Sequence, residues 1–553
     1  MPIRTPHRRL TAIVLAIGSL AAPSARASEI ATGNPDLSLR MDTTIRYNLG
    51  VRADKQDSRI LANPTYDESD GKFKRGDVVT NRLDLLGEVD LNWKNQLGVH
   101  ASASGWYDKA YDDHSVQTTV PGYSSSYVNN TYSPTVRRYV NGPSGEFLDA
   151  FVWGNFNLGA TPVSLKVGRH TNYWGEGLLI GAHAISYSQA PTDGAKAVTS
   201  PGIETKEVFL PLGNVSARAQ LSNRLSVQGQ YFFEWKPTRL PYGGTYFAPA
   251  DMLFEGPDRL PVSPTGTAFT HVDSLTPKNT GNWGVSAKYN AEEIESNIGL
   301  YYRRFNDYQP WFAPQTLAAL GQYRLVYPKN VQLFGVSAAR VIGPVSVGSE
   351  LSYRMDGALN ASGISAVDNE GPRGDTFHAV VNGVYLLPKS ALSDTGSLVA
   401  ELAYSQLTRV TSHPELYKGE GYGSCRAVAT PGVATSGSKD DGCSSKQYLG
   451  VALNFTPQWL QVQPSWDMEL PMSLSYGIHG NAASSGGGSE KSASWAVGVK
   501  FTYAQTHEFT LRYADTIAGP AKYNAAGTAL AGGNGGVGNT DRGWVVFTYK
   551  TGF

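Results

Sequence analysis

The chain has 553 residues, with 47 basic and 47 acidic side chains and a formal net charge of zero. A neutral chain gives no support to nucleic-acid binding. Beyond the N-terminal segment no run of 18 or more apolar residues occurs, which excludes a protein that crosses a membrane with helices.

The first 27 residues have the pattern of a cleaved export signal. Arginines precede the apolar stretch 10–22, and Ala25 and Ala27 give the small-residue pattern of a cleavage site. The apolar stretch is too short to span a bilayer, so we expect cleavage after Ala27 rather than a membrane anchor. We interpret residues 1–27 as a signal peptide and residues 28–553 as a single exported domain.

The composition narrows the class of the exported domain. The chain contains 60 Gly, 30 Tyr and 11 Trp but only 2 Cys and 6 Met. An exported, aromatic-rich and glycine-rich chain is either a soluble all-β protein or an outer-membrane β-barrel. The length favours the barrel, because no linker divides the chain into the several domains that a soluble protein of this size would need.

Several segments alternate apolar and polar residues like two-faced strands. Residues 37–51 place Leu, Met, Thr, Ile, Tyr and Val at odd positions, and residues 82–93 and 224–235 alternate in the same way. Strands of a soluble sandwich, the alternative, are about half this length. Charges on one face and aromatics on the other indicate a wet lumen and a lipid-facing wall.

The connections between these strands alternate between short and long. We count about 18 strands (16–18), and an even number places both chain termini on the periplasmic side with the short turns and the long loops outside. Short connections are expected at residues 94–95, 158–161, 222–223, 291–293, 343–344, 388–395, 457–458 and 505–506. Long ones are expected at residues 53–79, 108–146, 171–212, 237–280, 306–329, 356–375, 407–446, 480–492 and 516–541.

The carboxyl end completes the barrel pattern. Phe547, Tyr549 and the terminal Phe553 share one face of a last strand, and this resembles the signal by which the barrel-assembly machinery recognises its clients. Thr551 departs mildly from that pattern.

The two cysteines fall in one expected outer loop. Cys425 and Cys443 lie amid Gly, Ser and Asp with no His between them, so we predict a disulfide rather than a metal site.

The stretch 164–251 concentrates charge, aromatics, Gly and Pro, and we expect the functional residues there. Leu178, Leu179 and Ile180 would be badly placed in water, which indicates that this third long loop folds into the lumen. Its acidic side chains would then face basic residues of the wall, such as Arg169, Arg218 and Arg224. A plug that only stiffens the barrel is an equal alternative. The candidate constriction residues are Arg169, His170, Trp174, Glu176, Asp193, Lys196, Glu204, Lys206, Glu207, Arg218, Arg224 and Glu234.

Enzymatic chemistry has little support in the sequence. There is no G-x-S-x-G motif, and no His lies beside a Ser in a recognisable nucleophile motif. His170 as a base oriented by Glu176 is the alternative, but we expect no catalytic residue, no metal and no cofactor.

Several segments carry a family resemblance: VGRHTNYWGEG, APTDGAK, SPGIETKEVFLP and EWKPTRLPYGGTYFAPAD, with RLDLLGEVDLNW, GWYD and FLDAFVWGNF upstream. They resemble the hallmark segments of a Gram-negative, porin-like outer-membrane family catalogued as domain of unknown function 1302. Members typically have Gln at the position of His170. The resemblance implies envelope transport of a hydrophobic or lipid-like compound, and partners that include a periplasmic protein and an RND-type inner-membrane permease.

We therefore predict an all-β transmembrane barrel in the outer membrane, surrounded by lipid, that passes a small hydrophobic or lipid-like solute. The alternatives are a general diffusion porin for polar solutes, a barrel-rim hydrolase and a surface adhesin. The sequence leaves the solute, the direction of transport, the ion selectivity and the oligomeric state open.

Overall fold

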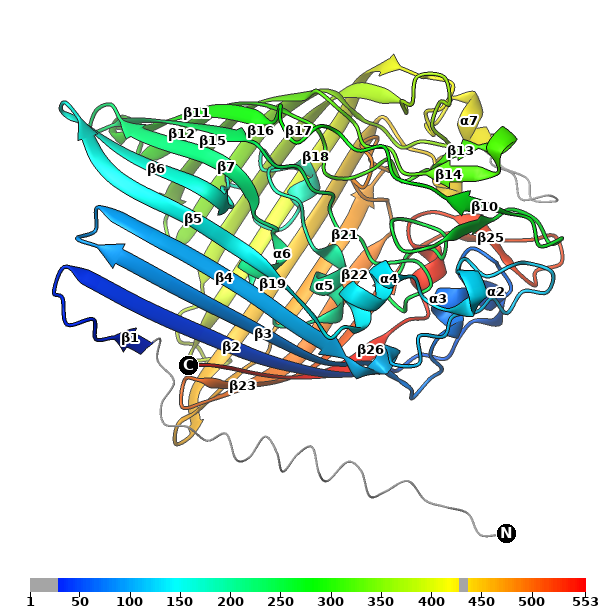
Figure 1. The fold of residues 1–553 in the computed structure, drawn as a ribbon, viewed down its shortest axis with the longest axis horizontal. Helices are drawn as coiled ribbons and strands as arrows, with labels where there is room; N and C mark the ends of the chain where they lie inside the picture. The colour runs from blue at the N-terminus through cyan, green and yellow to red at the C-terminus, as the bar shows by residue number, and fades with distance from the viewer. Residues whose placement is uncertain (1–27, 427–435) are drawn as a thin grey trace, which may run out of the picture.

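Long antiparallel strands form a closed barrel in the computed structural model, which describes residues 28–426 and 436–553 (Figure 1). The predicted signal peptide lies outside the described residues. Within those residues no helix is long and apolar enough to cross a membrane. The spanning elements are the strands.

Eighteen strands make up the barrel wall within the described ranges, with β20 and β21 counted as one strand because they follow each other between β19 and β22. This confirms the predicted fold class. The wall strands are β2 (Leu37–Arg52), β3 (Val78–Trp93), β4 (Leu97–Asp108), β5 (Ser144–Leu158), β6 (Thr161–His170), β7 (Leu212–Gln220), β8 (Leu225–Phe232), β11 (Trp283–Ala291), β12 (Ser296–Phe305), β15 (Val331–Ile342), β16 (Val345–Ala358), β17 (Arg373–Leu386), β18 (Thr395–Ser412), β19 (Gln447–Gln463), β20 (Trp466–Glu469) with β21 (Met472–His479), β22 (Ala493–Tyr503), β23 (His507–Ile517) and β26 (Trp544–Gly552).

Each wall strand pairs with the next along the chain, and the last pairs with the first. In the closing pair β2 runs antiparallel to β26, with Arg52 opposite Trp544 and Thr44 opposite Gly552. Every backbone N–H and C=O of a membrane-spanning segment needs a partner, and closure supplies one without leaving an edge. The short strand β1 (Ser28–Ile30) pairs with the periplasmic end of β2.

Short turns gather at one end of the barrel and long loops at the other (Figure 1). One predicted turn was wrong: residues 457–458 lie inside β19, where Gln458 pairs with both Thr395 and Glu469. The chain reverses at residues 464–465 instead. Pro457 lacks a backbone N–H, so it interrupts the hydrogen-bond ladder locally without ending the strand.

The nine long loops are numbered here in chain order: loop 1 (53–77), loop 2 (109–143), loop 3 (171–211), loop 4 (233–282), loop 5 (306–330), loop 6 (359–372), loop 7 (413–446), loop 8 (480–492) and loop 9 (518–543). Their described elements are α2 (Ser58–Leu61), α3 (Asp67–Gly71), η1 (Lys109–Tyr111), η2 (Val128–Asn130), α4 (Pro134–Val136), η3 (Arg137–Asn141), η4 (Gly181–His183), α5 (Gly194–Thr199), α6 (Thr205–Val208), β9 (Arg259–Pro261), β10 (Ala268–His271), β13 (Gln315–Leu317), η6 (Ala318–Leu320), β14 (Gln322–Arg324), α7 (Gly423–Arg426), η7 (Lys439–Asp441), β24 (Ala521–Tyr523), β25 (Leu530–Gly533) and η8 (Val537–Asn539); η5 (Glu292–Ile294) is a periplasmic turn.

Outward-facing positions of the strands are apolar and exposed. On β12, Leu300 is 55% exposed while its neighbour Tyr301, which faces inward, is 4% exposed. Exposed Leu, Val and Phe side chains recur at alternate positions of the other strands. An apolar outer surface on a closed barrel is the surface of an outer-membrane protein, and this confirms the predicted location.

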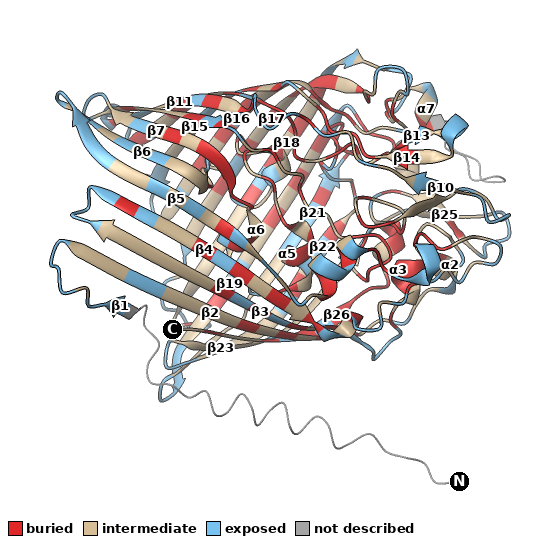
Figure 2. Ribbon diagram, in the orientation of Figure 1, coloured by how far each residue is buried: buried red, intermediate tan, exposed pale blue. Residues whose placement is uncertain are grey.

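Burial is concentrated in the half of the barrel that carries the long loops (Figure 2). On β2 the buried residues are the inward-facing ones near its extracellular end, whereas residues near the periplasmic end are accessible. The extracellular half of the barrel is therefore filled, and the periplasmic half is open to water. What fills it is mainly loop 3.

Candidate functional site

Loop 3 runs across the lumen and contacts strands on several sides of the barrel. It bonds to β2 through Glu207, to β3 through Ser200, to β12 through the carbonyl of Ile185, and to β16 and β18 through backbone N–H groups. Such contacts are possible only for a segment inside the barrel. The predicted inward fold of the third loop is confirmed.

Two buried carboxylates of the wall hold the first part of loop 3. Glu350 on β16 accepts hydrogen bonds from the N–H groups of Glu176, Gly177 (2.8 Å) and Ile185 (2.7 Å). Glu401 on β18 accepts from three consecutive N–H groups, those of residues 178–180, at 2.6, 2.9 and 2.5 Å. Both carboxylates are nearly inaccessible, at 3% and 1% exposure. They satisfy backbone donors that would otherwise be unpaired in a turn without secondary structure.

Arginines of the wall hold the same turn from its carbonyl side. Arg303 on β12 donates to the carbonyl oxygens of Ile185 (2.8 Å), Tyr187 (2.7 Å) and Ser188 (2.7 Å). Arg354 on β16 lies over the Tyr187 ring, 3.7 Å from its centroid. The backbone of this turn therefore has fixed partners for both its donors and its acceptors.

Wall glycines let loop 3 lie directly on the sheet. A Cβ atom at Gly335 of β15 would be 2.7 Å from the Ile185 side chain, and one at Gly284 of β11 would be 2.7 Å from the Trp174 ring. Trp174 and Ile185 are buried in one cluster with inward-facing residues of β12 and β15. Apolar residues of loop 3 thus pack on the inner wall, as its hydrophobicity predicted.

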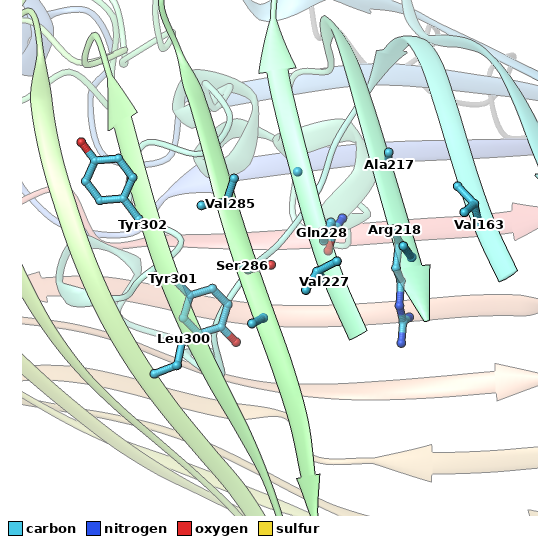
Figure 3. A pocket seen from close by; sticks show the side chains of 13 residues that line it. Val163, Ala217, Arg218, Val227, Gln228, Val285, Ser286, Leu300, Tyr301 and Tyr302 are labelled. Atoms are coloured by element: carbon cyan, nitrogen blue, oxygen red, sulfur yellow. The ribbon is translucent and has the colours of Figure 1, made fainter. Parts of the chain in front are cut away.

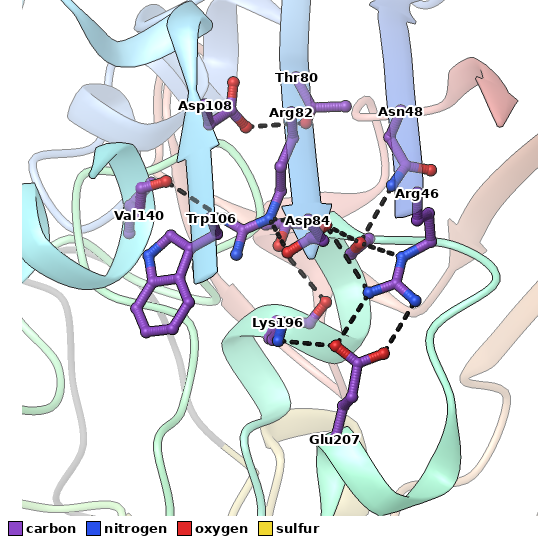
Figure 4. Close-up of polar contacts among 12 residues, drawn as sticks. Arg46, Asn48, Thr80, Arg82, Asp84, Trp106, Asp108, Val140, Lys196 and Glu207 are labelled. Carbon is purple, nitrogen blue, oxygen red and sulfur yellow. Dashed lines mark hydrogen bonds and ion pairs between the residues drawn. The ribbon is translucent and has the colours of Figure 1, made fainter. Parts of the chain in front are cut away.

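A charged cluster holds the second half of loop 3 (Figure 4). Glu207 lies between Lys196 (2.9 Å) of the same loop and the guanidinium of Arg46 (2.9 Å) on β2, and all three side chains are buried. Ser200 donates to Asp84 of β3 at 2.6 Å. Burial raises the pKa of Glu207, but the hydrogen bond from Arg46 and the charge of Lys196 outweigh it, and the pKa lies below its usual value. Glu207 is a buried carboxylate with two cationic partners.

The remaining acidic residues of loop 3 also have partners. Asp193 caps α5 through the Lys196 N–H (2.8 Å) and pairs with Arg239 of loop 4 (2.8 Å). Glu204 pairs with Lys550 of β26 (3.0 Å), and Lys206 pairs with Glu88 of β3. Asp193, Lys196, Glu204, Lys206 and Glu207 therefore lie together as ion pairs that fasten the loop.

The wall partners expected from the sequence were wrong. Arg169 lies 3.5 Å from Glu234, near the root of loop 4. Arg224 is at a periplasmic turn, where it pairs with Glu292 and Glu293. Arg224 directly follows the short periplasmic turn predicted at residues 222–223, so it lies at the end of the barrel opposite loop 3. Arg218, on β7, forms no ion pair within the described part of the chain.

His170 is the last residue of β6 and Trp174 lies in the first part of loop 3, but neither forms a reactive pair with Glu176. His170 is 2% exposed, and its Nε2 lies 2.8 Å from the Ser216 hydroxyl on β7. The Glu176 backbone instead bonds to Glu350 and to Asn382. A buried His without a carboxylate partner or access to solvent has the contacts of a structural residue.

Three residues that hold loop 3 were not among the candidates predicted from the sequence. Glu350, Glu401 and Arg303 lie on strands that are far from loop 3 in the sequence. Glu350 follows Ser349 and Arg303 precedes Arg304, so of these three residues only Glu401 carried a signal, as an isolated charge between the apolar residues Ala400 and Leu402. Such a charge needs a buried partner.

A cavity of about 440 Å³ remains between loop 3 and the wall formed by β19 to β26. Loop 3 contacts the two edges of this wall, through the ring of His183 on Tyr448 of β19 and the Glu204–Lys550 pair at β26. Between these edges, β23 has no buried residue along its length. The loops line the cavity with Leu179, Val198, Pro201 and Phe247, and the inward positions of the wall line it with Asn454, Ser473, Ser475, Ser494, Arg512, Thr516 and Trp544. The lumen is therefore narrowed but keeps a space lined by both apolar and polar groups.

Another cavity, of about 610 Å³, is a groove on the outer wall across β6, β7, β8, β11 and β12 (Figure 3). Ala217, Gly229 and Val285 form one row across β7, β8 and β11, and the next row is Ala219, Val227, Ala287 and Leu300. Val285 and Leu300 are half exposed. The groove faces the membrane and is not part of the lumen.

The other predicted features are placed as follows. Cys425 and Cys443 form the predicted disulfide in loop 7. Phe547 and Phe553 are exposed at the lipid face, with Tyr549 on the same side of β26. Within residues 28–426 and 436–553, no group of three His, Cys, Asp or Glu side chains is arranged to hold a metal ion.

Comparisons with known proteins identify the family. The family described as "Protein of unknown function (DUF1302)" matches residues 8–553, so the chain belongs to this family. A search of curated proteins finds no match.

Solved structures with a similar fold share little sequence. A structure of Pseudomonas aeruginosa OpdK with vanillate has 9% identity and a TM-score of 0.40, and the match covers 93% of this chain and 98% of that chain. Acinetobacter baumannii OccAB3 has 8% identity and a TM-score of 0.42, with 93% and 99% covered. Acinetobacter baumannii OccAB4 has 8% identity and a TM-score of 0.41, with 96% and 99% covered.

Proposed function

We propose that the protein is an outer-membrane channel, narrowed by loop 3, that passes a small solute with an apolar body. The observation that carries this proposal is the cavity of about 440 Å³ between loop 3 and the β19–β26 wall. Its volume falls within the roughly 300–1,000 Å³ of ligand-binding pockets. A plug that served only to stiffen the barrel would have no need of such a space.

The lining of the cavity favours an apolar solute over a sugar. Leu179, Val198 and Phe247 present apolar surface from the loops, and the wall contributes hydroxyl and amide groups together with the charged residues Arg512 and Asp515. An apolar body can displace water from the loop side while the wall groups bond to a polar end. A general diffusion porin, the alternative, has a polar lumen throughout.

Single-channel recording in planar bilayers tests this function. We expect benzyl alcohol to halve the open-channel current at a concentration about tenfold lower than glucose does, because burying an aromatic ring is worth more than about 1.4 kcal/mol. Liposome swelling is the second measurement. Free entry of sugars up to a trisaccharide would support the general porin and refute our proposal.

We further propose that the channel exchanges its solute with a periplasmic protein and an RND-type permease, as the family resemblance implies. The accessible periplasmic half of the lumen leaves room for such an exchange. Cross-linking in cells from the periplasmic turn at residues 464–465, with mass spectrometry of the products, tests it. Products that contain no envelope transport protein would argue against the partnership.

A further inference from the structure

Arg512 is the charged residue of the cavity whose guanidinium has no anionic partner. It faces inward from β23 and donates one hydrogen bond, of 3.3 Å, to the hydroxyl of Ser473 on β21. Among the described residues, no carboxylate lies within 4.0 Å of it. The other arginine at the cavity, Arg542, donates to the carbonyls of Tyr246 and Ala248 and lies 3.6 Å from Asp70.

The neighbours of Arg512 explain why it has no counter-ion. Its register partners are Gly498 on β22 and Val546 on β26, and neither has a polar side chain. Asp515 of the same strand also lines the cavity, but it accepts hydrogen bonds from the Tyr513 hydroxyl (3.4 Å) and the Thr516 N–H (2.7 Å) and forms no ion pair with Arg512. Glu508, further along the strand, is paired with Lys500. Because Gly498 has no side chain, Arg512 can extend across β22 toward Ser473. Its donors thus remain available at the edge of the cavity.

We propose that Arg512 is the anion-binding residue of the channel and that the solute is a small organic carboxylate with an apolar body. A guanidinium offers paired N–H donors that match the two oxygens of a carboxylate. With the carboxylate at Arg512, the apolar body of the solute lies against Leu179 and Val198 of loop 3. This assignment rests on the proposed channel function and names the class of its solute.

Benzoate and benzamide make the test, since they have the same shape and differ in charge at neutral pH. Each is added to single channels of the purified barrel, and the concentration that halves the open-channel current is measured. For the native protein we expect benzoate to act at about tenfold lower concentration than benzamide. Arg512→Gln should remove this difference, and Arg512→Lys should retain part of it.

Arg218→Gln is the matched control, because it removes the same charge from a wall arginine that does not line this cavity. It should keep the preference for benzoate, and heat-modifiable migration on gels should show that each variant is folded. Equal block by both compounds, or a preference that survives in Arg512→Gln, would overturn the assignment and leave the channel function standing. If neither compound reduces the current, both proposals fail.

Discussion

Glu401 accepts three consecutive backbone N–H groups of loop 3 with its two carboxylate oxygens. Hydrogen bonds to a charged acceptor contribute about 1.5–3 kcal/mol each when buried. In Glu401→Gln the side-chain NH₂ group, which can only donate, would replace one of the two accepting oxygens. At least one N–H group of loop 3 would then lose its hydrogen bond, so we expect the loop to detach in part. The open-channel conductance should rise and become noisier in planar bilayers.

Glu292→Gln provides the comparison for this change. Glu292 also loses a charge in that variant, but it lies at a periplasmic turn with Arg224 and does not contact loop 3. Its conductance should equal that of the native protein. The role given to Glu401 is wrong if the two variants behave alike.

Gly335 tests the close packing of loop 3 on the wall. A methyl group there would overlap the buried Ile185 side chain, and overpacking of this kind costs about 1–3 kcal/mol. Gly335→Ala should therefore lower the thermal unfolding temperature. The double variant Gly335→Ala with Ile185→Ala should recover part of the loss, since the second change makes room for the first. Additive effects of the two substitutions would show that these residues do not meet.

At the scale of the elements, α3 in loop 1 packs against loops 2 and 4 through buried carboxylates. Asp251 of loop 4 accepts from the N–H groups of Glu68 and Ser69 at 2.8 Å each, and Glu68 accepts from the Ser126 N–H at 3.0 Å. Burial raises the pKa of Glu68 to about 7, and the nearby charge of Asp67 acts in the same direction. Burial likewise raises the pKa of Asp251.

These shifts predict a pH dependence for the outer loops. A carboxyl whose pKa is higher in the folded state binds more protons there, so its contribution to stability falls as the pH rises from about 4.5 to about 7. Hydrogen exchange of the amides in residues 124–127 should therefore be slower at pH 5 than at pH 8, after correction for the intrinsic rate. Glu68→Gln should flatten this dependence. A native profile that is already flat would contradict the account of these loops.

The disulfide of loop 7 acts on its own loop. Cys425 and Cys443 are 18 positions apart in the sequence. A disulfide that closes a loop of this length stabilises the folded loop by about 3 kcal/mol, because it lowers the conformational entropy of the unfolded chain. The double substitution by Ser should speed cleavage by trypsin at Lys439 while the unfolding temperature of the barrel stays the same. Unchanged cleavage would mean that other contacts hold the loop.

At the scale of the whole molecule, the sequence predicted the barrel because strand alternation is a local property. Odd positions of residues 37–51 face lipid along the whole strand. The residues that form the turn of a hairpin directly follow its first strand in the sequence. The inward fold of loop 3 was also predictable from its apolar residues, of which Ile185 is fully buried. The expected burial of Leu178 was wrong, because its side chain is 52% exposed, and Leu179 is only partly buried at the cavity. The alternation of short and long connections indicated an even number of strands.

The partners of loop 3 were not predictable in the same way. Glu350 is 174 residues away from Glu176, and Glu401 is 223 residues away from Leu178. Nothing local in the sequence links either carboxylate to its partner in loop 3. Arg224 is closer to loop 3 in the sequence, but it follows the periplasmic turn at residues 222–223 and therefore lies at the other end of the lumen. Contacts across a barrel depend on the registers of many strands together, and these follow only from the complete fold.

The central claim is that loop 3 narrows the lumen and leaves a passage on the β19–β26 side. The most direct measurement is the single-channel conductance of the native barrel and of a variant that lacks residues 187–201, which include α5. Deletion of the exposed residues 525–528 at the tip of loop 9 is the control and should leave the conductance unchanged. We predict that the loop 3 deletion raises the conductance severalfold, roughly as expected when a barrel of 18 strands is opened. Equal conductance of the native barrel and the loop 3 deletion would contradict the claim.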